Sequence, residues 1–149
     1  MEQNLGIFLQ ISIAAFLGSL VGIERAVAGK TAGLRTFALV SMGSALFIIV
    51  SKLANESYLG ITTFDPSRVA SQIIVGIGFL GAGLIILKES KIMGLTTAAG
   101  LWVSAGIGIA VGFNLYAIAV FVTFLTLFIF TILWVVEIKL KKGIKDLED

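Results

Sequence analysis

Three charged side chains at the edges of long apolar segments are the residues of this sequence that could do chemistry. Glu24 and Asp65 carry carboxylates, and Arg35 carries a guanidinium. A carboxylate can bind a divalent cation, and a guanidinium can hold an anion or neutralise a carboxylate. The 149 residues include no Cys and no His, which excludes thiolate and imidazole metal sites, a Cys nucleophile and a Ser-His-Asp triad. No titratable pair has catalytic spacing, so we expect no enzyme and no cofactor.

The elements that carry these side chains are predicted to be membrane-spanning helices. The chain is 58% hydrophobic and 13% charged, whereas soluble domains carry about 25% charged residues. The charges are clustered, and the apolar windows between them are long enough to cross a bilayer core. These windows are residues 5–23, 35–53, 69–87, 95–113 and 115–136. We therefore predict an all-α integral membrane protein with a five-helix domain at residues 1–136 and a short charged cytoplasmic tail at 137–149.

The distribution of Lys and Arg predicts how the helices are oriented. Nine of the 11 basic residues fall in the first loop, the third loop and the tail, and only Lys52 and Arg68 fall on the other side. Because basic residues are retained in cytoplasmic loops, we predict five spans with the N-terminus outside and the C-terminus in the cytoplasm. The same rule accounts for the net charge of +2 without a nucleic-acid partner. Only Glu2 is charged before the first window, so we expect a mature helix there and not a secretory signal.

Glycines are concentrated in the first four windows. Gly18 and Gly22 form a G-x-x-x-G pair, and further glycines lie in the third and fourth windows. Small residues let helix backbones approach closely in lipid, so we expect helices 1–4 to pack together. The fifth window has no Gly from Ile118 to Val136 and is dense in large apolar residues. We expect this last helix to be peripheral and to face lipid.

The glycine run of the third window matches the pattern G-x-G-x-x-G. It consists of Gly76, Gly78, Gly81 and Gly83. After a strand and before a helix this pattern would indicate a dinucleotide site, but here it lies inside a long apolar window. Close helix packing is the favoured interpretation. A locally unwound stretch that lines a cavity is the alternative.

Glu24 and Arg35 form the candidate site on the predicted cytoplasmic side. Glu24 ends the first expected helix and Arg35 begins the second, so each charge lies at the unfavourable end of a helix dipole. A mutual ion pair would relieve both charges. Charged residues at membrane depth mark functional sites more often than not, so a functional role is weighed here against purely structural pairing.

The predicted outer side carries a second polar cluster. Asp65 followed by Pro66 is the pattern of an N-cap acid with Pro at the first helical position. A cation in the first turn opposes the helix dipole, so we expect Arg68 to pair with Asp65 or with another outer-side acceptor. Gln72 lies one turn further along and could face the same cavity as the glycine run.

Several ordered motifs resemble the MgtC/SapB family of membrane proteins over nearly the whole chain, to about Val136. The matching motifs are Gly18-Ser-Leu-Val-Gly22-Ile-Glu24-Arg25, Ala32-Gly33-Leu34-Arg35-Thr36, Asp65-Pro66-Ser67-Arg68 with Gln72, the run Gly76 to Gly83, and Gly94-Leu95-Thr96-Thr97-Ala98-Ala99 with Leu101-Trp102. The resemblance implies a five-helix, multi-pass protein of a bacterial inner membrane. The candidate functional residues are a cytoplasmic-edge cluster of Glu24, Arg25, Gly33, Arg35 and Thr36, an outer-edge cluster of Asp65, Arg68 and Gln72, and a fourth-helix motif of Gly94, Thr96, Thr97 and Trp102. Thr96 and Thr97 also have the simpler interpretation of a helix cap.

The resemblance also implies a physiological role. Members of that family are associated with growth at low magnesium, virulence and acid stress. Many are regarded as modulators of other membrane proteins, including the proton-driven ATP synthase. The sequence is similar to the short SapB type, which has no soluble domain, so we expect its membrane unit to act alone, as a homo-oligomer or with separate partners.

Magnesium or small-ion transport is the alternative function. Magnesium needs carboxylate and water oxygens, but Glu24 and Asp65 lie on opposite predicted sides and cannot share one ion unless a helix is strongly re-entrant. No acid lies in the middle of a window, so a carboxylate proton relay is not supported. Backbone carbonyls of an unwound glycine stretch could still carry ions. We therefore expect a modulator of a membrane partner. The identity of any bound metal stays unknown. A structural or lipid-linked role is the third interpretation.

Overall fold

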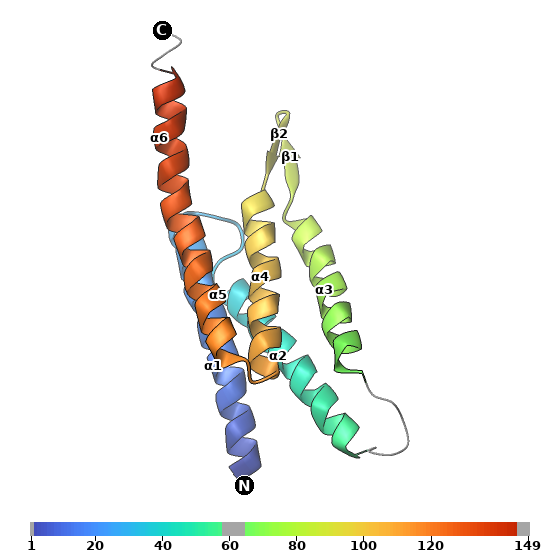
Figure 1. Cartoon of the computed structure of the whole chain (residues 1–149). Coiled ribbons are helices and arrows are strands. Elements are labelled where there is room, and N and C mark those ends of the chain that lie inside the picture. Colours follow the sequence, from blue (N-terminus) through green and yellow to red (C-terminus); the bar gives the residue numbers. More distant parts are fainter. Residues whose placement is uncertain (1, 58–64, 146–149) are drawn as a thin grey trace.

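The chain folds into a bundle of helices with one short β-hairpin (Figure 1). A computed structural model describes residues 2–57 and 65–145; most of the loop before Asp65 and the end of the charged tail lie outside the described residues. In chain order the elements are α1 (Glu2–Val27), α2 (Leu34–Ser57), α3 (Pro66–Gly83), β1 (Ile86–Lys88), β2 (Lys91–Met93), α4 (Leu95–Gly112), α5 (Tyr116–Phe128), the π-helix η1 (Ile129–Leu133) and α6 (Trp134–Lys145).

The prediction of long apolar helices is confirmed for four of the five windows. The described residues contain four helices that are long and apolar enough to cross a membrane: Asn4–Val27, Leu34–Asn55, Leu95–Gly112 and Tyr116–Gly143. The third apolar helix, Ser67–Gly83, is shorter. In the third window the helix therefore ends before the apolar sequence does.

The last stretch of the third window forms a hairpin, whereas a helix to residue 87 and then a loop were expected. Antiparallel pairing joins Ile86 to Met93 and Lys88 to Lys91. Gly94 has a φ of 90°, and a Cβ there would overlap the carbonyl oxygen of Leu84, so the chain needs glycine where the hairpin closes. A continuous apolar run does not distinguish helix from strand, which is why this change of structure was missed.

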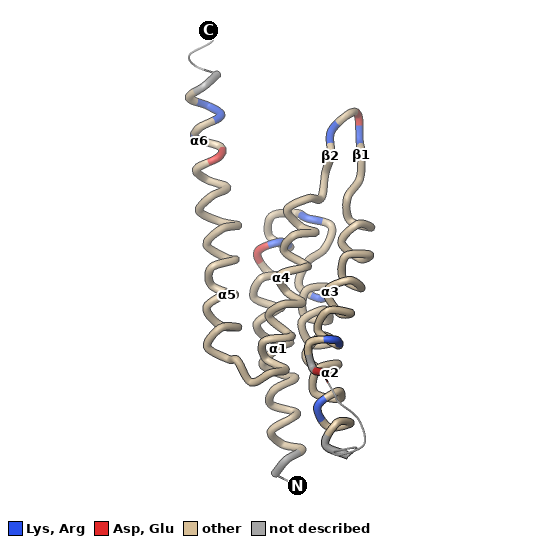
Figure 2. The backbone as a smooth tube through the Cα atoms, turned by 45° about the vertical axis from the view of Figure 1, so that its right-hand side comes forward, with Lys and Arg blue, Asp and Glu red and all other residues tan. Residues whose placement is uncertain are grey.

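Two helices run further than expected. α1 continues to Val27, so Glu24 lies about one turn before the end of the helix and is not its last residue. α5, η1 and α6 form one continuous helical segment that reaches Lys145, well into the expected tail (Figure 1). We call the end of the bundle that carries the hairpin and α6 the hairpin end. Figure 2 shows basic residues there on α6, on the hairpin and beside the end of α1.

The core of the bundle is formed by α1, α2 and α4, and glycines allow their close approach. A Cβ at Gly18 would lie 2.6 Å from the carbonyl oxygen of Phe37, and one at Gly22 would lie 2.6 Å from the Cα of Leu34. On α4, a Cβ at Gly108 would overlap the backbone of Ser41. Here the small residues replace side-chain volume with direct backbone contact between helices.

The expectation that α3 belongs to this core is wrong. α3 packs along α4, but Gly81 is its only buried residue among those described. Apart from the adjacent backbone of α3 itself, no described atom lies within 4 Å of a Cβ built at Gly76, Gly78 or Gly83. The glycine run remains helical to Gly83, so the unwound alternative is not found either. The fifth helix, by contrast, buries Ala119, Thr123 and Thr126 against the bundle, although most of its large side chains are exposed, as predicted.

Candidate functional site

The most buried charge of the described chain lies near the end of α1. Arg25 is 4% exposed, and its guanidinium forms an ion pair with the neighbouring Glu24. The Nε of Arg25 donates to one carboxylate oxygen, and Nη2 donates to the other at 2.7 Å. This bidentate arrangement is the strong form of the arginine–carboxylate pair. Both oxygens of Glu24 are therefore engaged.

The expected ion pair between Glu24 and Arg35 is thus wrong. Residues i and i+1 of a helix do not normally face each other, but the side chains of Glu24 and Arg25 are oriented so that they form a pair. Arg35 is exposed in the first turn of α2 and has no ion pair within residues 2–57 and 65–145. Of the other cluster members, Gly33 packs against Ala26 and Thr36 is exposed.

A ring from the far end of the sequence completes the environment of Arg25. The guanidinium carbon lies 3.7 Å from the centroid of the Phe130 ring. Phe130 is 6% exposed and fits into a notch at Gly100 of α4, where a Cβ would lie 2.5 Å from its Cζ and 3.3 Å from Cε1 of Phe37. A desolvated cation–π contact is worth about 2 kcal/mol. The site therefore joins α1, α2, α4 and the fifth helix.

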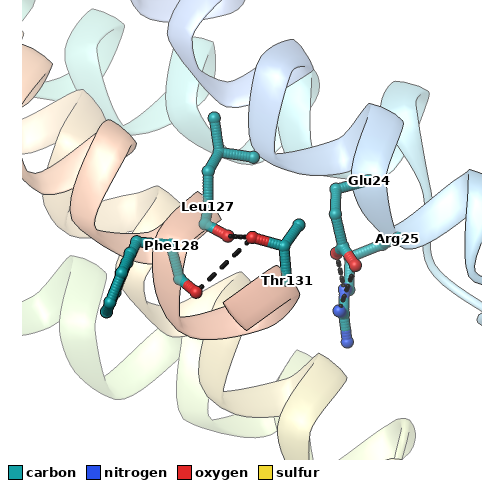
Figure 3. A network of polar contacts seen from close by, with 5 residues as sticks. All are labelled: Glu24, Arg25, Leu127, Phe128 and Thr131. Atoms are coloured by element: carbon teal, nitrogen blue, oxygen red, sulfur yellow. Dashed lines mark hydrogen bonds and ion pairs between the residues drawn. The ribbon is translucent and has the colours of Figure 1, made fainter. Parts of the chain in front are cut away.

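The π-helix η1 presents Phe130 to this site. Such a segment has an altered backbone hydrogen-bond pattern, and single π-turns are frequent at functional sites. The hydroxyl of Thr131 donates to the carbonyl oxygens of Leu127 at 2.7 Å and Phe128 at 3.5 Å. Figure 3 shows these residues beside Glu24 and Arg25. In lipid, backbone carbonyls must find donors within the protein, and Thr131 supplies one where the helix is irregular.

The outer-edge residues are not brought together in one site. Asp65 caps α3, since its Oδ1 accepts a hydrogen bond of 2.9 Å from the backbone of Ser67. The hydrogen bonds from Ser67 lower the pKa of the Asp65 carboxyl below its ordinary value, and the nearby Arg68 adds to this effect. Arg68 is exposed without an ion pair among the described residues, so the expected pair with Asp65 is not found. Gln72 lines a groove between α2 and α3.

The fourth-helix motif is divided between structural roles. Gly94 is the N-cap of α4 and has no side chain, and no cap bond is formed by Thr96 or Thr97 in the described chain. Thr97 is buried, whereas Thr96 is exposed. Trp102 of α4 is half exposed and lines a pocket together with Ile74 and Ile118.

A polar clamp at the opposite end of the bundle was not singled out from the sequence. The Nε2 of Gln10 donates to the carbonyl oxygens of Val111 at 2.6 Å and Gly112 at 3.1 Å, and to Oδ1 of Asn114 at 3.0 Å. Lys52 also reaches the Gly112 carbonyl, at 3.5 Å. These bonds engage carbonyls in the last turn of α4, where the helix itself supplies few donors.

Sequence reasoning also missed Phe130, Gly100 and Thr131 as members of the site. Nothing in an apolar run shows which ring will meet a cation. Thr131 did carry a signal, because it is the one polar residue between Thr126 and Glu137. A lone hydroxyl in such a run indicates a hydrogen bond to a backbone carbonyl or to a neighbouring helix.

Comparison with known proteins gives one consistent family. The MgtC family profile matches residues 11–138. The chain is 43% identical over 123 residues to "Putative magnesium transporter YhiD" of Escherichia coli K12, covering 81% of this chain and 57% of that protein. It is 42% identical over 130 residues to protein MgtC of Salmonella typhimurium LT2, covering 85% and 53%. Protein SrpB of Synechococcus elongatus is 38% identical over 133 residues, covering 83% and 72%.

The length of these relatives differs from that of the chain. The chain spans somewhat more than half of YhiD and of MgtC. No solved structure matches it at a significant level.

Proposed function

This chain belongs to the MgtC family, and we propose that it modulates another membrane protein, or ion homeostasis, in a bacterial inner membrane under low magnesium or stress. The family membership supports a membrane protein linked to magnesium. The resemblance of the motifs to proteins regarded as modulators, including modulators of the proton-driven ATP synthase, supports the finer statement. A membrane partner, or a second copy of the chain, follows from this role, and no enzyme activity is part of it.

The charge distribution supports an orientation with the hairpin end in the cytoplasm. The basic residues of the α1–α2 loop, the hairpin and α6 lie at that end, and basic residues on the last part of α2 and the first part of α3 lie towards the other (Figure 2). Retention of basic residues in the cytoplasm then leaves the N-terminus outside. The third helix, extended by the apolar strands of the hairpin, provides the fifth crossing.

The engagement of Glu24 by Arg25 is the observation that carries the proposal. A magnesium site uses one or two carboxylates together with retained water. Both oxygens of Glu24 already accept hydrogen bonds, and the pair lies between the core helices and Phe130. The pair therefore serves better as a packed element that sets the position of the fifth helix than as a ligand for a passing ion.

Magnesium transport remains the second candidate function. The name of the YhiD protein describes that relative as a transporter of magnesium. For this chain, transport at this site would require the ion to displace Arg25 from Glu24. The modulator and the transporter therefore differ in whether loss of the Glu24 carboxylate changes magnesium flux.

The first experiment measures magnesium flux into sealed vesicles that contain the purified chain. Wild type is compared with Glu24→Gln, which keeps the size of the side chain, and with Lys91→Gln, a matched surface change on the hairpin. An established magnesium channel in the same vesicles verifies the assay. Under the proposal, no variant should give saturable magnesium flux into the vesicles. In cells, wild type and Lys91→Gln should support growth at low magnesium, and Glu24→Gln should not. Magnesium flux that is lost in Glu24→Gln alone would establish the transporter instead.

A further inference from the structure

A groove between α2 and α3 opens on the surface of the bundle. Its volume is about 720 Å³. Its lining is almost wholly apolar and includes Leu39, Gly43 and Phe47 of α2 and Ile73, Gly76 and Leu80 of α3. Leu39 and Phe47 are about 60% exposed, although they lie on a helix long and apolar enough to cross a membrane. In a bilayer such a surface faces hydrocarbon.

Glycines keep this groove open. Apart from the adjacent backbone of its own helix, no described atom lies within 4 Å of a Cβ built at Gly43 or at Gly76, although both residues line the groove. Gly18, Gly22 and Gly108 differ, because there a Cβ would meet the backbone of a neighbouring helix. Along α2 the groove runs from Leu39 to Ser51, about 18 Å at 1.5 Å per residue. One leaflet of the hydrocarbon core is about 15 Å thick, so the groove matches the length of one acyl chain.

A cation continues the groove towards the hairpin end. Leu39, Gly43 and Phe47 follow one another at intervals of four residues, and Arg35 precedes Leu39 by the same interval, so it lies on the same helix face. Arg35 is exposed and has no ion pair in the described part of the chain. The start of α2 lies beside Gly22, more than a turn before α1 ends at Val27, so Arg35 does not project beyond the bundle. A cation at this depth calls for an anion.

We propose that the α2–α3 groove binds one anionic phospholipid, with its phosphate on Arg35 and an acyl chain along the apolar lining. The chain then enters from the hairpin end and points towards the centre of the bilayer, which agrees with the direction of the groove. The proposal does not depend on the modulator function, because it concerns only which lipid the protein retains.

Native mass spectrometry of the full chain tests the proposal by counting bound lipid. The purified protein is titrated with phosphatidylglycerol or with phosphatidylcholine of the same acyl chains. Wild type is expected to retain phosphatidylglycerol in preference, and Arg35→Gln to lower its affinity about fivefold, towards that of phosphatidylcholine. Arg35→Lys, which keeps the charge, should retain most of the preference. Lys91→Gln removes a hairpin cation away from the groove and should leave binding unchanged.

Two substitutions on one helix test the groove itself. Gly76→Leu places a side chain in the groove, whereas Gly78→Leu places it on α3 outside the lining; both positions have open space, so both variants should fold. Gly76→Leu should lower retention of both lipids, and Gly78→Leu should bind as wild type does. Circular dichroism and a monodisperse elution profile verify folding.

Three results would overturn the proposal. The first is equal retention of the two lipids by wild type. The second is unchanged phosphatidylglycerol binding by Gly76→Leu. The third is a lipid-free wild-type dimer that Gly76→Leu converts to monomer, since a second copy of the chain would then occupy the groove.

Discussion

The guanidinium of Arg25 lies 3.7 Å from the centre of the Phe130 ring while it also holds the carboxylate of Glu24. One side chain of α1 is thereby bound to a neighbour in its own helix and to the π-segment of the fifth helix. The charge is nearly excluded from solvent, so both interactions are stronger than they would be at an exposed site.

The ion pair can be separated into structural and functional parts. Arg25→Leu leaves Glu24 without its partner and should reduce the free energy of unfolding by about 3–5 kcal/mol. The double variant Glu24→Leu, Arg25→Leu replaces both charges with apolar side chains and should recover most of that loss. Chemical denaturation in detergent measures both values. If the double variant also supports growth at low magnesium, the pair is purely structural.

The ring of Phe130 should matter beyond its volume. Phe130→Leu keeps an apolar side chain but removes the π-face, and we expect a loss of about 2 kcal/mol in stability. Phe128→Leu is the matched control, because Phe128 is half exposed on the same helix. The comparison is made by thermal unfolding in the same detergent. Equal effects of the two substitutions would contradict a specific role for the ring.

Close backbone contact predicts different responses at two glycines of α4. Gly108→Ala puts a Cβ into the backbone of Ser41 on α2 and should destabilise the protein by about 1–3 kcal/mol. Gly106→Ala has open space around the new Cβ and should be neutral or slightly stabilising. Unfolding curves of the two variants measure the difference. Similar curves would show that α2 and α4 adjust to the extra methyl group.

The cap of α3 predicts a pH dependence at Asp65. Hydrogen bonds from Ser67, and then the charge of Arg68, lower the pKa of this exposed carboxyl below its ordinary value of 3.8. A lowered folded-state pKa means that the ionised cap stabilises α3 at pH values above 3.8 and that this contribution is lost as the pH falls through the lower folded-state pKa. A carbon-13 NMR titration of the Asp65 carboxyl should give a pKa below 3.8.

A matched substitution checks the cause of that shift. Ser67→Ala removes the side-chain donor and should move the pKa of Asp65 back towards its ordinary value. Asp65→Asn should keep the cap and remove this contribution to the acid sensitivity of α3. A titration that is the same in wild type and Ser67→Ala would assign the shift to another group.

The membrane helices could be predicted because their apolar windows are long and the charges between them are few. The glycines showed that close packing occurs, but their number does not reveal which face of a helix meets a neighbour. Gly18 and Gly108 meet backbone, whereas a Cβ at Gly76 or Gly78 would meet no described atom outside the backbone of α3 within 4 Å.

The candidate site was predicted in part. Glu24 and Arg25 were both expected at the cytoplasmic edge. The predicted partner of Glu24 was wrong, because the positions of charges along the chain do not determine which conformation a long side chain adopts. Phe130 was beyond sequence reasoning, since it meets Arg25 only through the tertiary contact of α1, α4 and the π-segment. Such a contact leaves no periodic pattern.

The continuous helix from Tyr116 to Lys145 has a mechanical consequence. It is held at Phe130, near its middle, while α6 extends beyond the bundle by 12 residues, about 18 Å (Figure 1). The half before Phe130 is packed on the bundle through Ala119, Thr123 and Thr126, so α6 is a cantilever whose root lies at the notch at Gly100. A load on the far end of α6 would be transmitted as torque to Arg25, and a change in the Glu24–Arg25 pair would be magnified as movement of that far end.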